Sequence, residues 1–144
     1  MGKVSIVYWS GTGNTEAMAA AMAEGAKDAG AEVELLTVDK ADAAALSEAK
    51  AFALGCPAMG AEELEEGEME PFMAELDSQI AGKTIALFGS YGWGGGEWMR
   101  DWESRVVSDG AAVLSGEGII ADNAPDDDVL AECRAAGAKL AALV

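Results

Sequence analysis

Short apolar runs alternate along the chain with longer stretches whose apolar residues recur every three or four positions. The first run, Lys3 to Trp9 (KVSIVYW), is nearly continuous apolar and β-branched, which is typical of a strand buried on both faces of a parallel sheet. Four further runs follow, over Glu32 to Val38, Lys50 to Cys56, Lys83 to Ser90 and Ala112 to Ile120. The pattern therefore predicts five strands.

Helices are expected between these strands. The first, from Thr15 to Ala29, carries Met18, Met22 and Ala26 at helical spacing and stops before Gly30. The others are expected over residues 42–48, 70–80, 97–108 and 126–143, and the last opens with three aspartates that suit a helix N-terminus. Strands alternating with helices predict an α/β fold, a doubly wound parallel sheet with helices on both faces, in one domain spanning residues 1–144.

Composition narrows the function. The chain has 144 residues, 51% of them apolar, and a formal net charge of -17, so its field would repel nucleic acid and anionic membranes and favour partners with basic faces. It has no His, which lowers the prior for zinc or hydrolytic chemistry. Cys56 and Cys133 are interpreted as reduced core thiols, and the start MGKVSIV lacks a signal peptide. We expect a cytoplasmic monomer that binds neither nucleic acid nor membrane.

Three unusual loops follow the first, third and fourth predicted strands: SGTGNT, PAMGAEE and YGWGGG. In a doubly wound sheet, ligands bind beyond the carboxyl ends of the strands, where strand order reverses. The three loops should therefore meet at one end of the sheet and form one site.

The first loop suits a phosphate monoester. Gly11 and Gly13 allow backbone amides to turn inward, hydroxyl and amide side chains flank them, and a helix N-terminus follows at once. The loop lacks the third glycine of a dinucleotide fingerprint, since Glu16 stands there, and the Gly-Lys-Ser/Thr of a nucleotide triphosphate loop. It would hold the phosphate with neutral donors alone.

The other two loops suit a flat heterocycle. Trp93 lies between glycines directly after a strand, a poor position for a core side chain, and Met59 offers a soft thioether to the opposite face of a ring. Backbone amides around Gly92 and Gly94 could serve ring acceptors, and Gly60 can invert its peptide at little steric cost.

These motifs, with LGCPAMGAEELEEGEMEPF and ALFGSYGWGGGEWMRDWE in the same order, resemble the short-chain bacterial flavodoxins over the whole chain. The resemblance implies strand order 2-1-3-4-5, one bound FMN, and one-electron transfer between redox proteins without substrate turnover. It implies that Met59 and Trp93 face the isoalloxazine, that the Gly60 carbonyl accepts from N5 and that Glu62 binds N3. The full cofactor-binding set that it implies is Ser10, Gly11, Thr12, Gly13, Asn14, Thr15, Pro57, Ala58, Met59, Gly60, Ala61, Glu62, Ser90, Tyr91, Gly92, Trp93 and Gly94.

Three positions depart from the family pattern. Pro57 replaces a small hydroxyl residue found in many relatives, Ala61 replaces a more common Asp, and Gly95 replaces an acidic residue of some relatives.

The acidic run from Glu62 to Glu70 bears on the redox couple. Negative charge beside the cofactor opposes the second electron, so we expect a low second potential and cycling mainly between semiquinone and hydroquinone. Glu63, Glu65 and Glu66 could be a solvated face or a docking patch for basic redox proteins.

Two other classes of function stay open on the sequence. An FMN-dependent quinone or nitro reductase would need an accessible ring and usually a dimer. A receiver-type signalling domain would need an acidic cluster after the first strand, where Tyr8 and Trp9 stand instead.

Overall fold

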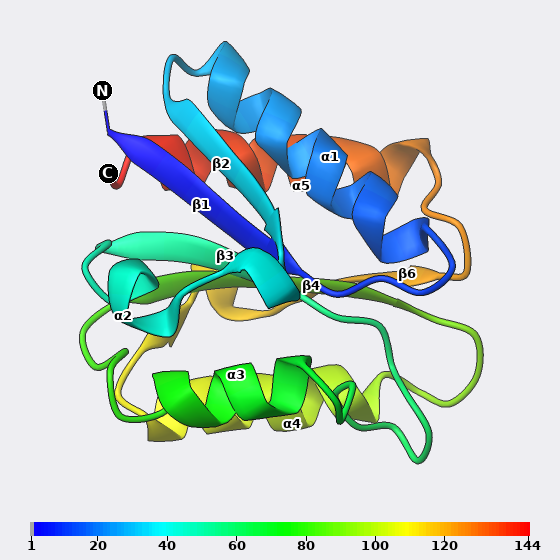
Figure 1. Ribbon diagram of the computed structural model, residues 1–144. Coiled ribbons are helices and arrows are strands. Elements are labelled where there is room, and N and C mark those ends of the chain that lie inside the picture. The colour runs from blue at the N-terminus through cyan, green and yellow to red at the C-terminus, as the bar shows by residue number, and fades with distance from the viewer. Residues whose placement is uncertain (1) are drawn as a thin grey trace.

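A computed structural model describes residues 2–144 as one parallel sheet between two layers of helices (Figure 1). The strands are β1 (Lys3–Tyr8), β2 (Glu32–Thr37), β3 (Ala51–Gly55), β4 (Thr84–Tyr91), β5 (Ala112–Val113) and β6 (Ile119–Asp122). The α-helices are α1 (Asn14–Asp28), α2 (Ala43–Leu46), α3 (Met69–Leu76), α4 (Glu97–Ser108) and α5 (Asp127–Ala141), and short 3-10 turns span Val38–Lys40 and Leu114–Gly116. The sheet order β2-β1-β3-β4-β5 confirms the predicted fold.

The prediction of one continuous strand over Ala112 to Ile120 was wrong. Both β5 and β6 pair with β4, so they share one place at the edge of the sheet, but residues 114–118 leave it between them. Ser115 and Gly116 adopt left-handed backbone conformations (φ 62° and 86°), and the side chain of Met99 fills the space that a Cβ at Gly118 would need. Left-handed residues cannot continue a strand, which explains the break.

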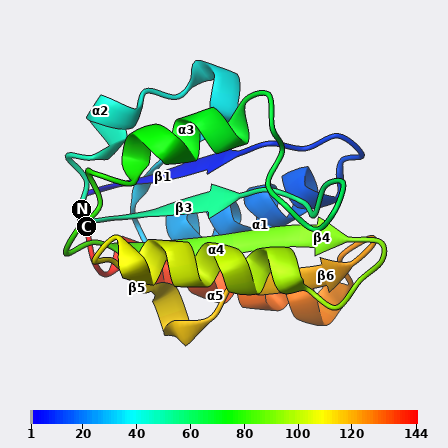
Figure 2. The same cartoon turned by 90° about the horizontal axis from the view of Figure 1, so that it is seen from below.

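Each face of the sheet has its own core. One core contains Phe52, Leu54, Trp98 and Trp102 beneath α2, α3 and α4, and the other contains Ile6, Met18 and Phe88 beneath α1 and α5. Figure 2 views the molecule from the α3/α4 side, and its strand arrows point the same way, toward the end where the long loops gather. None of the helices that the structure describes is long and apolar enough to cross a bilayer.

The backbones of α1 and α5 approach each other unusually closely. A Cβ at Gly25 would overlap the carbonyl of Arg134, and one at Gly137 would overlap the carbonyl of Met22. Glycine at both positions lets the two helix backbones touch, and an ion pair from Arg134 to Glu24 at 3.3 Å spans the same crossing. This contact fixes α1, whose first turn follows the first loop.

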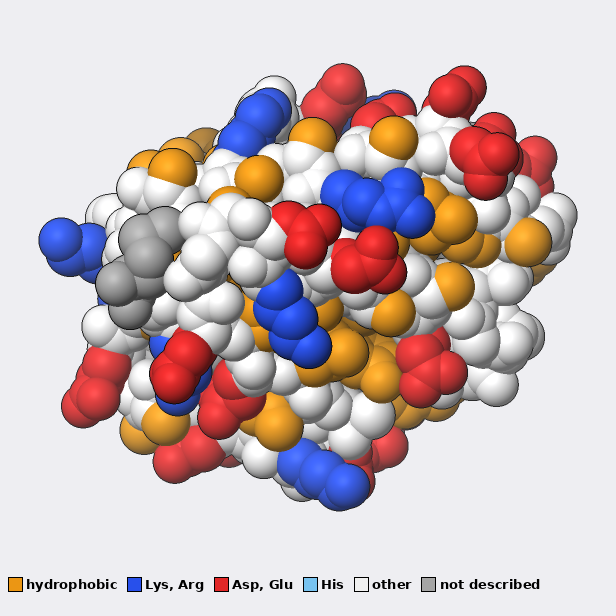
Figure 3. Space-filling model, turned by 90° about the horizontal axis from the view of Figure 1, so that it is seen from above, with side chains coloured by type: hydrophobic (Ala, Val, Ile, Leu, Met, Phe, Trp, Pro, Cys, Tyr) orange, Lys and Arg blue, Asp and Glu red, His pale blue; other side chains and the backbone are white. Residues whose placement is uncertain are grey.

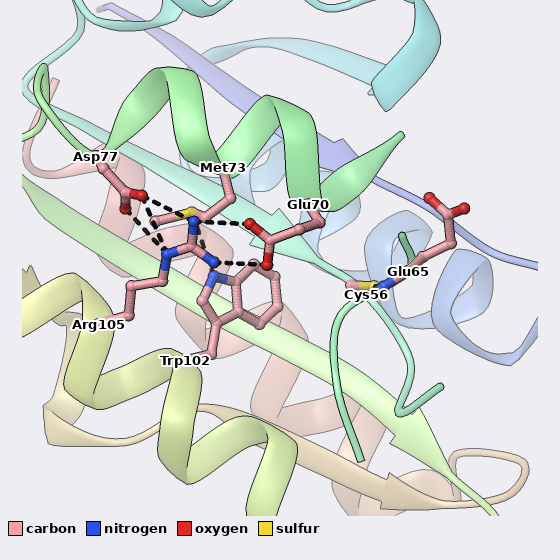
Figure 4. Close-up of polar contacts among 7 residues, drawn as sticks. All are labelled: Cys56, Glu65, Glu70, Met73, Asp77, Trp102 and Arg105. Atoms are coloured by element: carbon pink, nitrogen blue, oxygen red, sulfur yellow. Dashed lines mark hydrogen bonds and ion pairs between the residues drawn. The ribbon is translucent and has the colours of Figure 1, made fainter. Parts of the chain in front are cut away.

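On the other face, Arg105 of α4 ties α4 to α3. Its guanidinium donates to both carboxylate oxygens of Glu70, at 2.8 Å each, and to Asp77, with the shortest contact at 2.8 Å (Figure 4). Burial raises the pKa of Asp77, but the bonds from Arg105 outweigh it and hold that pKa below its ordinary value. These ion pairs of Arg105 hold α3 and α4, the helices that follow the second and third loops, in a fixed relative position.

Asp109, at the end of α4, lies against Asp77 with one carboxylate oxygen buried and without a donor. Burial and the neighbouring Asp77 carboxylate raise the pKa of Asp109 from 3.8 to about 6. Once protonated, Asp109 can donate to Asp77, so the proton stabilises the folded state.

Because the pKa of Asp109 is raised in the folded state, Asp109 contributes stability at pH values below its ordinary pKa of 3.8. That contribution is lost as the pH rises through about 6. Asn at this position donates at every pH. We predict that Asp109→Asn gains unfolding free energy over the wild type above pH 6 and little below pH 4, measured by urea denaturation across this range. Asp101→Asn, an exposed carboxylate on the same helix, should show no such dependence on pH. A constant offset for Asp109→Asn would contradict the account.

Candidate functional site

The three loops meet at the carboxyl edge of the sheet, around a cavity of about 260 Å³. Each loop contributes to its wall, and a fourth segment joins them after β6. The described lining residues are Trp9, Gly11, Thr12, Asn14, Pro57, Ala58, Met59, Ser90, Tyr91, Gly92 and Asn123. None of these side chains is charged, so the cavity itself is neutral although the chain is strongly acidic.

The first loop turns from β1 into α1. Gly13 caps the helix with φ 96°, and the Ser10 hydroxyl accepts from the amides of Gly13 and Glu16 at 3.2 and 3.3 Å. Within residues 2–144 the amides of Gly11, Thr12, Asn14 and Thr15 donate to no acceptor. Free amides at a helix N-terminus form an anion-binding cradle. The residues present therefore fit a phosphate monoester without a cation.

Thr15 lies behind the loop rather than on its surface. It is fully buried, its hydroxyl accepts from the Ser90 amide at 3.3 Å, and the two hydroxyls of Thr15 and Ser90 lie 3.2 Å apart. When Ser90 donates in that pair, the Thr15 proton stays free to point into the loop. Thr15 thus both ties the first loop to β4 and keeps a donor available.

The second loop is a tight hairpin. Met59 and Glu63 exchange two backbone hydrogen bonds of 2.9 Å, and Gly60 and Glu62 between them have φ of 48° and 56°. Met59 is half-buried against the cavity, and Gly60 and Ala61 are exposed at the tip. The missing N–H of Pro57 costs nothing here, because the sheet bonds on either side are made by Cys56 and Ala58, to Phe88 and Ser90.

Glu62 connects the second loop to the third. One of its carboxylate oxygens accepts from the amides of Gly96 and Glu97, at 3.2 and 2.9 Å, and so caps α4. The carboxylate also occupies the space that a side chain at Gly94 would need, and Gly94 has φ 82°. The second carboxylate oxygen of Glu62 makes no hydrogen bond within the described residues and is available to a ligand.

The third loop carries Trp93, whose side chain is 58% exposed. A large aromatic side chain left this far in solvent among flexible glycines is available to cover a bound ring. Gly92 lines the cavity, whereas Gly95 faces open space. Of the predicted site residues, Ser10, Gly13, Thr15, Gly60, Ala61, Glu62, Trp93 and Gly94 lie beside or behind the cavity rather than in its wall.

Sequence reasoning missed Trp9 and Asn123. Trp9 continues β1 by donating its backbone N–H to the Gly55 carbonyl at 3.0 Å, whereas the sequence pattern indicates only the end of a strand there. Asn123 has φ 60°, and its backbone N–H donates to the Tyr91 carbonyl at 2.7 Å. Its side-chain oxygen lies close to Gly92. A signal for Asn123 existed, because an Asn directly after a strand favours such a turn, but the strand was expected to end at Ile120.

Comparisons with known proteins decide the family. The model of the flavodoxin family matches residues 6–137. This chain belongs to the flavodoxin family. It is 47% identical over 135 residues to the flavodoxin of Megasphaera elsdenii, covering 92% of this chain and 98% of that one. It is 48% identical over 124 residues to the flavodoxin of Clostridium beijerinckii, covering 86% and 89%.

A solved structure gives the same answer for the fold. The solution structure of two-electron reduced Megasphaera elsdenii flavodoxin matches with a TM-score of 0.86 at 46% identity, over 94% of this chain and 98% of that one. Flavodoxins bind FMN and carry electrons rather than turning over a substrate, so the cofactor is FMN and the reductase alternative is not favoured. Within residues 2–144 no cluster of acidic residues and cysteines could hold a metal ion.

The acidic run beside the site divides into two groups. Glu62, Glu65 and Glu70 are bonded inside the protein, whereas Glu63, Glu66 and Glu68 are exposed. Glu65 accepts from the amides of Gly67, Glu68 and Met69 at 2.7 to 3.0 Å and so caps α3. Burial raises the pKa of Glu65, but these three bonds outweigh it and lower that pKa below its ordinary value.

Glu65→Ala should therefore lower the unfolding free energy at neutral pH by about 1 kcal/mol, the usual worth of an N-terminal cap. Because the pKa of Glu65 is lowered in the folded state, Glu65 contributes stability at pH values above its ordinary pKa. That contribution is lost as the pH falls through its pKa in the folded state. Glu63→Ala, an exposed control two residues away, should change stability by less than about 0.5 kcal/mol. Equal losses in the two variants by urea denaturation would refute the assignment.

Proposed function

We propose that the neutral cavity at the carboxyl edge holds FMN, and that the residues implied by the flavodoxin motifs are its binding set. The observation that carries this proposal is the coincidence of two features: four unpaired amides in the first loop and the first turn of α1, and a wall of described residues without a charged side chain. Such a site suits a phosphate monoester joined to an uncharged aromatic ring.

The roles of individual residues follow from their positions. The amides of residues 11, 12, 14 and 15 would hold the phosphate, helped by the partial positive charge of the α1 N-terminus. Met59 and Trp93 would cover the two faces of the ring, and the free oxygen of Glu62 would accept from N3. Bound FMN supplies one-electron chemistry. The Gly60 carbonyl, at the exposed hairpin tip, would accept a hydrogen bond from a proton at N5 and so stabilise the state reached after one electron.

The surroundings oppose the second electron. Glu62 lies at the site, three exposed carboxylates lie on the neighbouring segment, and no Lys or Arg lines the cavity. Added negative charge therefore meets repulsion with only helix-end partial charges to offset it. This supports a low second potential.

Cofactor-free protein mixed with FMN should bind one equivalent and quench the flavin fluorescence. During titration with dithionite, the visible spectrum should pass through a distinct one-electron species before full reduction, with the second potential well below that of free FMN. Protein that takes up no FMN would refute the site. Steady-state oxidation of NADH by the purified protein alone would refute the role as a carrier.

We also propose that the partners are redox proteins with basic faces. Lys3, Lys50 and Lys83 lie at or just before the amino ends of β1, β3 and β4, and Lys27 and Lys139 lie in the last turns of α1 and α5. These cations lie at the end of the sheet away from the site. In Figure 3, which shows the face of α1 and α5, the Lys and Arg side chains lie toward the left and centre among further acidic side chains, whereas the right-hand end shows acidic side chains without Lys or Arg. The asymmetry supports steering of a basic partner toward the site.

Buried cysteines and a scattered apolar surface support the remaining parts of the proposal. Cys56 and Cys133 are both buried and unpaired, which suits the reducing cytoplasm. Among residues 2–144, the exposed large apolar residues are Leu35, Trp93, Val107 and Leu143, which lie on different elements, and this scatter supports a monomer.

Charge reversal can test the docking face with a matched control. Glu63→Lys, Glu66→Lys and Glu68→Lys together should slow electron transfer to cytochrome c, a basic haem protein, by roughly tenfold or more at low salt. Asp28→Lys, Glu48→Lys and Glu75→Lys make the same change in net charge at exposed positions near the opposite end. Stopped-flow rates should then change little. Equal slowing in both triple variants would show that net charge alone matters.

A further inference from the structure

Cys56 lies at the point where β3 becomes the second loop, and it is fully buried. Its sulfur contacts both ends of that loop: the thiol donates to the Pro57 carbonyl at 3.4 Å, and the amide of Glu65 donates to the sulfur at 3.4 Å. Figure 4 draws Cys56 directly beside Glu65. One atom thus closes the base of the nine-residue segment 57–65, which carries Met59 and Gly60.

Trp98 holds the same residue from the other side. Its indole is 1% exposed, and Nε1 donates to the Cys56 carbonyl at 3.0 Å. Its ring also lies 5.7 Å from that of Tyr91, at 48°, at the start of the third loop. Because Trp98 belongs to the first turn of α4, which follows the third loop, it links the bases of both loops.

Between these outer contacts lies the Met59–Glu63 hairpin described above. The hairpin bonds fix the shape of the tip, but they do not fix the tip relative to the sheet. That orientation depends on the base, where the Cys56 amide bonds to Phe88 at 3.0 Å and a Cβ at Gly89 would overlap the Cys56 carbonyl. A shift of the base would therefore carry Met59 and Gly60 with it.

We propose that Cys56 and Trp98 are positioning residues, which set the placement of Met59 and Gly60 against FMN and thereby its affinity and the spacing of its two potentials. This inference rests on the proposed function for the roles of Met59 and Gly60. Burial raises the pKa of the Cys56 thiol to about 12, so the S–H donor persists at neutral pH. Cys56 does not pair with Cys133, which is buried in the core on the opposite face of the sheet.

The chain offers two matched controls. Trp102 is a buried tryptophan one turn further along α4, and its Nε1 donates to the Met73 sulfur of α3 at 3.4 Å rather than to the base of the second loop. Cys133 is a buried, unpaired thiol that has no contact with segment 57–65. Trp98→Phe and Cys56→Ala are compared with Trp102→Phe and Cys133→Ala.

Hydrogen exchange in the cofactor-free protein tests the contacts of the Cys56 sulfur without FMN. In Cys56→Ala the Glu65 amide loses its acceptor, and we expect it to exchange about tenfold faster or more, relative to core amides of the same variant. Cys133→Ala should leave this ratio unchanged. An unchanged ratio in Cys56→Ala would show that the Cys56 sulfur does not hold the base of segment 57–65, whatever the protein binds. This outcome would overturn the proposal and can be distinguished from a failure to bind FMN.

The FMN dissociation constant and the two reduction potentials then test whether these contacts position the second loop against FMN. Trp98→Phe and Cys56→Ala should each raise the FMN dissociation constant roughly 5- to 30-fold, the worth of a buried hydrogen bond. They should also narrow the gap between the first and second potentials, because the Gly60 carbonyl is less well placed. Cys56→Ser should restore part of both. Trp102→Phe and Cys133→Ala should stay within about twofold of wild type. Equal effects in test and control variants would overturn the proposal, and Trp98→Phe tests it independently if Cys56→Ala fails to fold.

Discussion

The carboxyl end of β4 is the support on which the whole site depends. Its carbonyls at Phe88, Ser90 and Tyr91 accept the amides of Cys56, Ala58 and Asn123, and its Ser90 amide donates to Thr15. All the loops around the cavity are therefore bonded to one strand that is buried along most of its length. A site assembled in this way is rigid at its base, and only its outer tips, at Gly60 and Trp93, are exposed.

Charged side chains are absent from the described wall of the proposed cofactor site but frequent on the surface around it. Among the residues that the structure describes, none with a charged side chain lines the cavity, whereas the surrounding surface at that end is strongly acidic. A phosphate dianion can be bound by local amides, which act over a few ångströms, while the longer-range negative field still acts on the ring. Binding and redox tuning are thus separated, because they depend on different groups.

The fold and the meeting of the three loops around one cavity could be predicted from the sequence because both depend on local pattern. Alternating apolar runs and helical repeats predicted the strand and helix order, and an unusual loop after each of three strands pointed to the carboxyl edge. The break in the last strand could not be predicted, since it depends on left-handed backbone at Ser115 and on the Met99 side chain from another element. Asn123 was missed for the same reason.

The internal bonding of the acidic run was equally hidden. Glu62, Glu65 and Glu70 look like Glu63, Glu66 and Glu68 in the sequence. They differ only because the fold brings unpaired amides of α3 and α4, and the guanidinium of Arg105, within reach. A run of like residues does not reveal which of its members meet a donor from a distant element. The cofactor-binding set remains a prediction, since it concerns contacts with a molecule that sequence and fold only imply.

Five of the six lysines lie toward the amino ends of the strands, whereas Lys40 follows the carboxyl end of β2. This distribution has a practical consequence beyond partner choice. A molecule with more acidic charge around its proposed cofactor site than at its lysine-bearing far end behaves as an electric dipole. On a positively charged electrode or anion exchanger, the acidic end that carries the proposed cofactor site would turn toward the support. The same asymmetry that selects a protein partner would therefore give an oriented monolayer, in which molecules exchange electrons with the electrode without a mediator.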